Sequence, residues 1–229
     1  MPRRNALRLL AALPAALALP ACGLLGGNRY RFRLSVAVDT PEGLRTGSSV
    51  YEVRAQNRWS PLPDMASRTW EVRGEAAAVD LPGGRTLFAL LRTGAHFEDM
   101  MGLSMASLHP DFAGTGYDVV GVAKELARGA WPGPAPVAPE DYPMLVTFAD
   151  ENNPASVQLV EPGNLAAAFG SGSRLRGITV ELTDDAVTSG IEERLPAPDE
   201  RGFFNWDGRS NPNLPGTFNI SDFGRGTKT

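Results

Sequence analysis

The stretch "RYRFRLSVAVD" at residues 29–39 decides the fold expected for this chain. Its large apolar side chains occupy every second position, and arginines or small residues stand between them. A period of two is typical of a β-strand with one buried and one exposed face. The residues "TPEG" that follow predict a turn, because Pro41 presets its backbone and Gly43 accepts a positive φ. The stretch "SSVYEVRAQ" at 48–56 then predicts the returning strand of a hairpin.

A second pair of strands is predicted at 69–81, "TWEVRGEAAAVDL", and 85–92, "RTLFALLR", joined by the turn "PGG". The apolar run from Leu87 to Leu91 is continuous, which indicates a central strand covered on both faces. Later strands are predicted at "MLVTFAD" (144–150), "SVQLV" (156–160) and "RLRGITVELTD" (174–184).

Helical periodicity appears at 97–108 and again at 118–129. In the first stretch apolar residues recur at spacings of three and four, which predicts a helix that buries Phe97, Met101 and Leu108 and stops before Pro110. Gly129 is expected to end the second helix. A third, short helix is predicted within "PGNLAAAFG" (162–170), with Pro162 at its first position and Gly170 past its end.

Together these elements predict an α+β fold: an antiparallel or mixed β-sheet with a few short helices. The alternative is a β-sandwich with helical insertions. We expect a single globular domain over 29–195, with the Pro-rich stretch 130–143 as the best candidate for an internal boundary. Residues 196–229 predict a loosely structured C-terminal arm that pins some of its aromatic rings onto the domain, because pure linkers rarely carry so many aromatics.

The chain opens "MPRRNALRLLAALPAALALPAC", a basic start followed by a short apolar stretch. This is typical of a secretory signal, here residues 1–21, and the apolar stretch is too short to span a bilayer. Cys22 is the only cysteine, and an unpaired cysteine in an exported protein needs an explanation. The residues "LPAC" resemble the lipobox of bacterial lipoproteins, with Leu19 at −3 and Ala21 at −1.

That resemblance implies that Cys22 is lipidated and becomes the N-terminus of the mature protein. Residues 22–28, rich in glycine, would form a flexible tether. The membrane is then a partner through the acyl chains on Cys22, and the location is the periplasmic side of the cell envelope. Gly23 stands where an aspartate marks inner-membrane retention in enterobacterial lipoproteins, so the outer membrane is favoured over the inner one.

Two further stretches, "YRFRLSVAVDTPEGLRTGSSVYEVR" and "YPMLVTFADENNPASVQLVEPGNLAAAFGSGSRLRGITVELTD", resemble an uncharacterised group of proteobacterial lipoproteins. The resemblance implies one globular envelope domain and brings no activity or site residues with it.

The charge balance argues against nucleic acid as a partner. The chain has 22 basic and 26 acidic residues, and removal of residues 1–21 leaves 19 against 26, a net charge of −7. A nucleic-acid-binding protein presents a basic patch or stripe. An envelope protein remains a possible partner.

No convergent catalytic set is apparent. The residues "GLSMA" around Ser104 approach the nucleophile elbow of hydrolases, but the only later histidine, His109, is five residues away. The stretches "GTG", "GSGS" and "DGRSN" lack the spacing of nucleotide-binding or calcium loops. The remaining charged candidates are expected on solvated surfaces: Glu98, Asp99, Asp184, Asp185, Arg29, Arg31 and Arg33.

One group of residues has side chains that could bind a metal ion. Met101, Met105 and His109 recur every four residues, and thioether with imidazole suits Cu(I). The other histidine, His96, flanks the same predicted helix. The competing interpretation is that these methionines fill the core. The sequence therefore favours a lipid-anchored envelope protein with a binding or structural role and with no cofactor. The alternatives are an envelope hydrolase that uses acidic residues and a Cu(I)-binding envelope protein.

Overall fold

The computed structural model describes residues 28–57, 68–93, 99–109, 111–112, 118–129, 133–150, 153, 156–195 and 220–224. The strands in this part of the chain are β1 (Arg29–Thr40), β2 (Gly43–Asn57), β3 (Arg68–Arg73), β4 (Ala77–Leu81), β5 (Arg85–Thr93), β6 (Ala135–Pro136), β7 (Pro143–Phe148), β8 (Val157–Leu159) and β9 (Arg174–Leu182). The helices are α1 (Met100–Leu108), α2 (Val119–Leu126) and α3 (Leu165–Phe169), with 3₁₀ turns η1 (Pro139–Asp141), η3 (Ile191–Arg194) and η4 (Ile220–Phe223).

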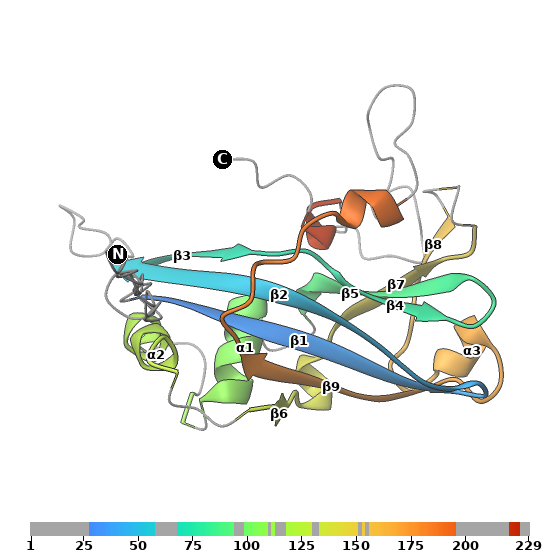
Figure 1. Ribbon diagram of the computed structural model, residues 1–229, viewed down its shortest axis with the longest axis horizontal. Helices are drawn as coiled ribbons and strands as arrows, with labels where there is room; N and C mark the ends of the chain where they lie inside the picture. The colour runs from blue at the N-terminus through green and yellow to red at the C-terminus, as the bar shows by residue number, and fades with distance from the viewer. Residues whose placement is uncertain are drawn as a thin grey trace, which may run out of the picture.

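The strands form two antiparallel sheets (Figure 1). Sheet A has the order β3-β2-β1-β9-β6, and sheet B has the order β4-β5-β7-β8. Every strand pairing within the described residues is antiparallel. The predicted α+β class is confirmed: the fold is mostly sheet, and in the described part of the chain neither sheet closes into a barrel.

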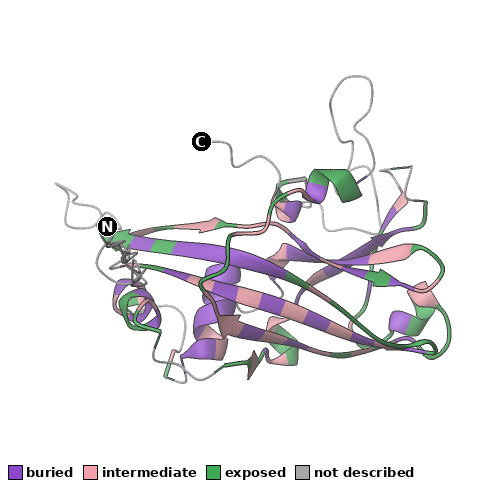
Figure 2. Ribbon diagram, viewed as in Figure 1, coloured by how far each residue is buried: buried purple, intermediate pink, exposed green. Residues whose placement is uncertain are grey.

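The predicted hairpin forms the centre of sheet A. Strands β1 and β2 pair from Arg29↔Arg54 to Thr40↔Gly43, so the turn is only Pro41 and Glu42 and β2 begins earlier than the sequence indicates. Alternate residues of β1 are buried, visible as alternating colours in Figure 2. The inner residues Phe32, Leu34 and Val36 are completely buried, which makes this face one wall of the main core.

The stretch 69–81, predicted as one strand, is two strands in different sheets. β3 adds to sheet A beside β2, the chain crosses at 74–76, and β4 adds to sheet B beside β5. The crossing begins at Gly74, whose φ of +146° is accessible to glycine and strained for other residues. A Cβ there would also lie 2.5 Å from the Tyr51 ring. The "PGG" turn joins β4 to β5, as predicted.

β5 is covered on both faces, as its apolar run predicts. Leu87 and Ala89 point into the main core, which sheet B, α1 and α2 share with sheet A. Phe88 and Leu90 point the other way, into a second core that η3 and η4 cover. Sheet B is therefore the middle layer of the molecule.

Helix α1 lies inside the main core and is buried on nearly every side, so it lacks the one-sided apolar stripe that the sequence predicts. It begins at Met100, after the N-cap Asp99, whose side chain accepts a hydrogen bond from the Gly102 N–H. Met101 and Leu108 are buried, as predicted, and the helix ends at Leu108. Phe97 lies outside the described residues.

The two other helices differ from the prediction only at their ends. α2 ends at Leu126, and Gly129 follows with φ +67°. α3 begins at Leu165 after the N-cap Asn164, so Pro162 precedes the helix and does not open it. Gly170 follows its last residue, as predicted.

The Pro-rich stretch does not separate domains where it is described. Ala135 and Pro136 form β6, which pairs with Val180 and Thr179 at the edge of sheet A. Val137 donates its N–H to the Ile178 carbonyl and is buried. An edge strand tolerates proline because one side of its backbone has no partner strand. Local composition indicates a linker here, and pairing with a distant strand overrides it.

Gly47 of β2 packs closely against β4 of the other sheet. A Cβ there would lie 2.0 Å from the Ala78 carbonyl oxygen of β4. We predict that Gly47→Ala lowers the free energy of unfolding by at least about 2 kcal/mol, because backbone must move to relieve the overlap. Urea unfolding measures the change. The control is Gly177→Ala on β9, where a Cβ meets nothing within 4 Å. Equal stability of the two variants would contradict the prediction.

Candidate functional site

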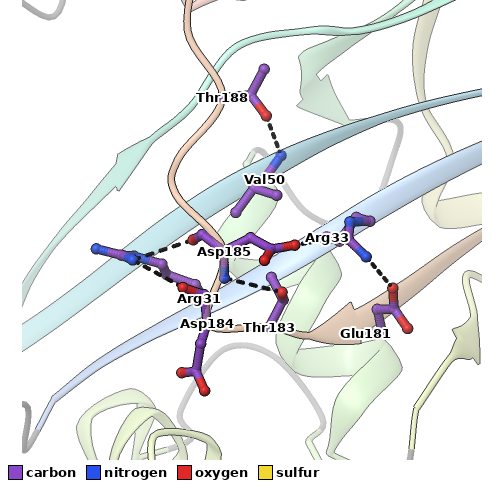
Figure 3. A network of polar contacts seen from close by, with 8 residues as sticks. All are labelled: Arg31, Arg33, Val50, Glu181, Thr183, Asp184, Asp185 and Thr188. Carbon is purple, nitrogen blue, oxygen red and sulfur yellow. Dashed lines mark hydrogen bonds and ion pairs between the residues drawn. The ribbon is translucent and has the colours of Figure 1, made fainter. Parts of the chain in front are cut away.

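The outer face of sheet A carries a network of polar contacts (Figure 3). Because β1 alternates, its odd-numbered residues Arg29, Arg31 and Arg33 project from the face opposite the core. The Arg31 Nε donates to Glu52 Oε2 at 2.9 Å, and the Arg29 Nε lies 3.7 Å from the same oxygen. Glu52 stands opposite Arg31 in the β1–β2 register, and its side chain is only 7% exposed.

A segment that we call the crossing segment, residues 183–190, passes over this face after β9 ends. The Thr183 N–H donates to the Arg31 carbonyl, and the Thr188 N–H donates to the Val50 carbonyl. In return the Val50 N–H donates to Thr188 Oγ1 at 2.8 Å. The backbone of Val50 can bind Thr188 because β3 pairs with β2 only from Glu52 onward.

Arg31 and Arg33 of β1 bind the crossing segment through hydrogen bonds. The Arg31 Nη1 donates to the carbonyl oxygens of Asp184 and Asp185, at 3.5 and 3.2 Å. Arg33 donates to Glu181 Oε1 at 2.9 Å and, through its other terminal nitrogen, to the Asp185 carboxylate. The expectation of a solvated face is confirmed for Asp185, which is exposed, but only in part for Arg31 and Arg33, because the returning chain partly covers them.

A second ion cluster lies where β1 ends and β9 begins. Asp39 accepts hydrogen bonds from Arg174 and Arg176, at 3.2 and 2.9 Å. These two guanidinium groups, Arg176 first, hold the pKa of the Asp39 carboxyl below its usual range. That is the direction opposite to the one a general acid requires at neutral pH.

Ser104, at the centre of the near-elbow sequence, is completely buried in α1. Its hydroxyl lies 2.8 Å from the Tyr30 hydroxyl and also donates to the Met101 carbonyl. A nucleophile must be reachable by substrate, and this one belongs to a satisfied polar pair inside the core. The sequence indicated only that a histidine partner was lacking, and the structure adds the burial.

The methionines of α1 pack in the main core. Met101 is 6% exposed and Met105 is completely buried, in agreement with the core-filling interpretation. His109 is the C-cap residue of α1, and its Nε2 lies 3.1 Å from Glu125 Oε2 on α2. His96 and Glu98 lie outside the described residues, within which no three His, Cys, Asp or Glu side chains gather as a metal site would require.

Two polar roles were not anticipated from the sequence. Asp99, expected on a solvated surface, caps α1 and accepts a hydrogen bond from the Trp70 indole at 2.6 Å. The cap has a sequence signal, since aspartate is a favoured N-cap residue. The bond to Trp70 has none, because it depends on where β3 passes α1.

Of the remaining motifs, one lies within the described residues. The residues "GSGS" at 170–173 form the turn from α3 to β9. The stretches "GTG" and "DGRSN" and the candidate lipidation residue Cys22 lie outside the described residues. In the part of the chain that is described, no helix has the length and apolar character needed to cross a bilayer.

Comparison of the whole chain with protein-family models, curated proteins and solved structures finds no match. The resemblances to the lipobox and to proteobacterial lipoproteins therefore stay predictions.

The arginine contacts predict a local effect on dynamics. Arg33→Gln removes the ion pairs to Glu181 and Asp185, and we expect the amides of Thr183 and Thr188 to exchange with deuterium about three- to tenfold faster. Mass spectrometry of the exchanged protein measures this. The control is Arg45→Gln, whose partner Glu42 lies in the β1–β2 turn region. Unchanged exchange at 183–188 would show that the arginine does not hold the segment.

Two buried tyrosines predict an alkaline loss of stability. Burial raises the pKa of both Tyr30 and Tyr51 above the usual value near 10. Above about pH 10 the unfolded chain releases these protons and the folded chain keeps them, so each tyrosine removes up to about 1.4 kcal/mol of stability per pH unit.

Tyr30→Phe should therefore reduce the fall in the free energy of unfolding between pH 10 and 11 by about 1 kcal/mol. Urea unfolding at a series of pH values compares the variant with the wild type. Parallel curves would contradict the prediction for Tyr30.

Proposed function

We propose that this chain is a lipid-anchored protein of the bacterial cell envelope with a binding or structural role. The observation that carries the proposal is the single cysteine, Cys22, placed directly after a basic and apolar leader in the sequence "LPAC". Gly23 favours the periplasmic face of the outer membrane over the inner membrane.

The chemistry of such an anchor is sufficient to hold the protein. Each buried CH₂ of an acyl chain contributes about 0.8 kcal/mol, and stable anchoring takes two chains or more. A diacylglyceryl group on the Cys22 thiol supplies two. Without that group the thiol has no disulfide partner in its own chain, because the sequence contains no other cysteine.

The position of the anchor also favours one orientation of the domain. Residues 23–28 separate Cys22 from the first residue of β1, and six residues reach at most about 20 Å. The end of sheet A where β1 begins would therefore lie close to the bilayer, with α2 near that end (Figure 1). The β1–β2 turn, at the opposite end of a twelve-residue strand, would point away from the membrane.

A binding or structural role is favoured over catalysis by the partners of the described charged groups. Glu52, Asp185 and Asp39 each bind arginines of the same chain. A hydrolase of the acidic type needs two carboxylates about 5 to 9.5 Å apart across a cleft, one of them protonated. No observation on the described residues favours that alternative.

Metabolic labelling with palmitate tests the anchor. We expect the wild-type protein to incorporate label and to sediment with membranes, and Cys22→Ala to lose the label completely. Gly23→Asp is the matched variant, because it keeps the acceptor thiol and should move the labelled protein from the outer to the inner membrane. Equal label in the wild type and in Cys22→Ala would refute the proposal.

A further inference from the structure

We propose that the outer face of sheet B is a docking groove for the Phe-Gly segment at residues 220–224, and that two copies of the chain exchange this segment. The groove does not depend on the lipid anchor. It is the second apolar core of the fold, and one of its walls, η4, comes from a remote part of the chain.

An aromatic slot in the groove receives Phe223. The ring is completely buried and lies edge-on to Phe88, with centroids 5.7 Å apart, and roughly parallel to Phe148, with centroids 6.2 Å apart. Phe88 and Phe148 themselves pack edge-to-face at 5.8 Å. These are the separations that aromatic pairs prefer, so the slot fits a phenyl ring in shape and in orientation.

The backbone around Phe223 is recognised as well. The Ala76 N–H donates to the Phe223 carbonyl at 3.0 Å, at the point where the chain crosses from sheet A to sheet B. Gly224 adopts φ +89°, and a Cβ on it would lie 2.3 Å from the Gly74 carbonyl oxygen. The groove therefore requires a glycine directly after the phenylalanine. Any other residue would be strained at this φ, and its Cβ would overlap the backbone at Gly74.

The length of the chain makes exchange between copies geometrically possible. Leu195 is buried in this same core, and 24 residues of sequence separate it from Ile220. A stretch of that length reaches at most about 80 Å when fully extended. Each copy presents both a groove and a Phe-Gly segment, so the segments of two copies fit each other's grooves in the manner of a domain swap.

Binding of a peptide tests the groove. The probe is fluorescein-labelled "NISDFGRG", residues 219–226, and the receptor is the full-length chain in detergent. Phe223→Ala should bind the probe at least tenfold more tightly than the wild type does, because the segment of the wild type competes at millimolar effective concentration. Probes that carry Phe223→Ala or Gly224→Ala should not bind. Equal binding to both proteins, or no binding to either, would overturn the groove.

Photo-crosslinking tests the second copy and does not require Phe223→Ala to fold. A benzophenone amino acid replaces Phe223 in a full-length chain, which is mixed with a differently tagged copy and irradiated. We expect adducts between the two chains that map to β5 or β7. The control places the same group at Ser221, which is exposed. Adducts within single chains only, at every protein concentration, would overturn exchange between copies.

Discussion

Burial of the inner face of the β1–β2 hairpin is the constraint on which the rest of the fold depends. Phe32, Leu34 and Val36 are completely shielded from water, and each such side chain contributes roughly 1.5 to 3 kcal/mol by leaving it. A single sheet cannot shield its own face, so sheet B, α1 and α2 must cover the hairpin. This explains why α1 is buried on nearly all sides: it packs in the core that the two sheets share.

Covering the hairpin creates a second requirement, because sheet B has apolar residues on both faces. Phe88 and Leu90 need cover on the side away from the hairpin, and they receive it from chain that follows β9. To arrive there, residues 183–190 cross the outer face of sheet A, where Arg31 and Arg33 bind them. The arginine network and the second core therefore follow from the same packing requirement. The arginines on the outer face of sheet A bind the chain that goes on to cover sheet B.

The contacts of the polar side chains within the chain are relevant to function. Polar groups that invite a catalytic interpretation in the sequence are engaged within the chain: Ser104 with Tyr30, Asp99 with Trp70, and Asp185 with Arg33. Engagement of these particular groups within the chain suits a protein that acts by position and by docking, which is what an envelope anchor and a Phe-Gly groove would provide. Both proposals place recognition at the ends of the chain, on segments that the globular body does not need for its main core.

Much of the local structure is determined by the sequence itself. Alternation along 29–39 determined β1 and its buried face, the run Leu87–Leu91 determined a strand covered on both sides, and Pro110 determined where α1 stops. The sequence alone also carries the single cysteine on which the proposed anchor rests. Only the tertiary structure decided that 69–81 divides between two sheets, that the proline-rich Ala135–Pro136 joins an edge, and which carboxylate each arginine meets. The physical reason is that these features depend on partners tens of residues away, and a local pattern of side chains does not specify which distant backbone will lie beside it.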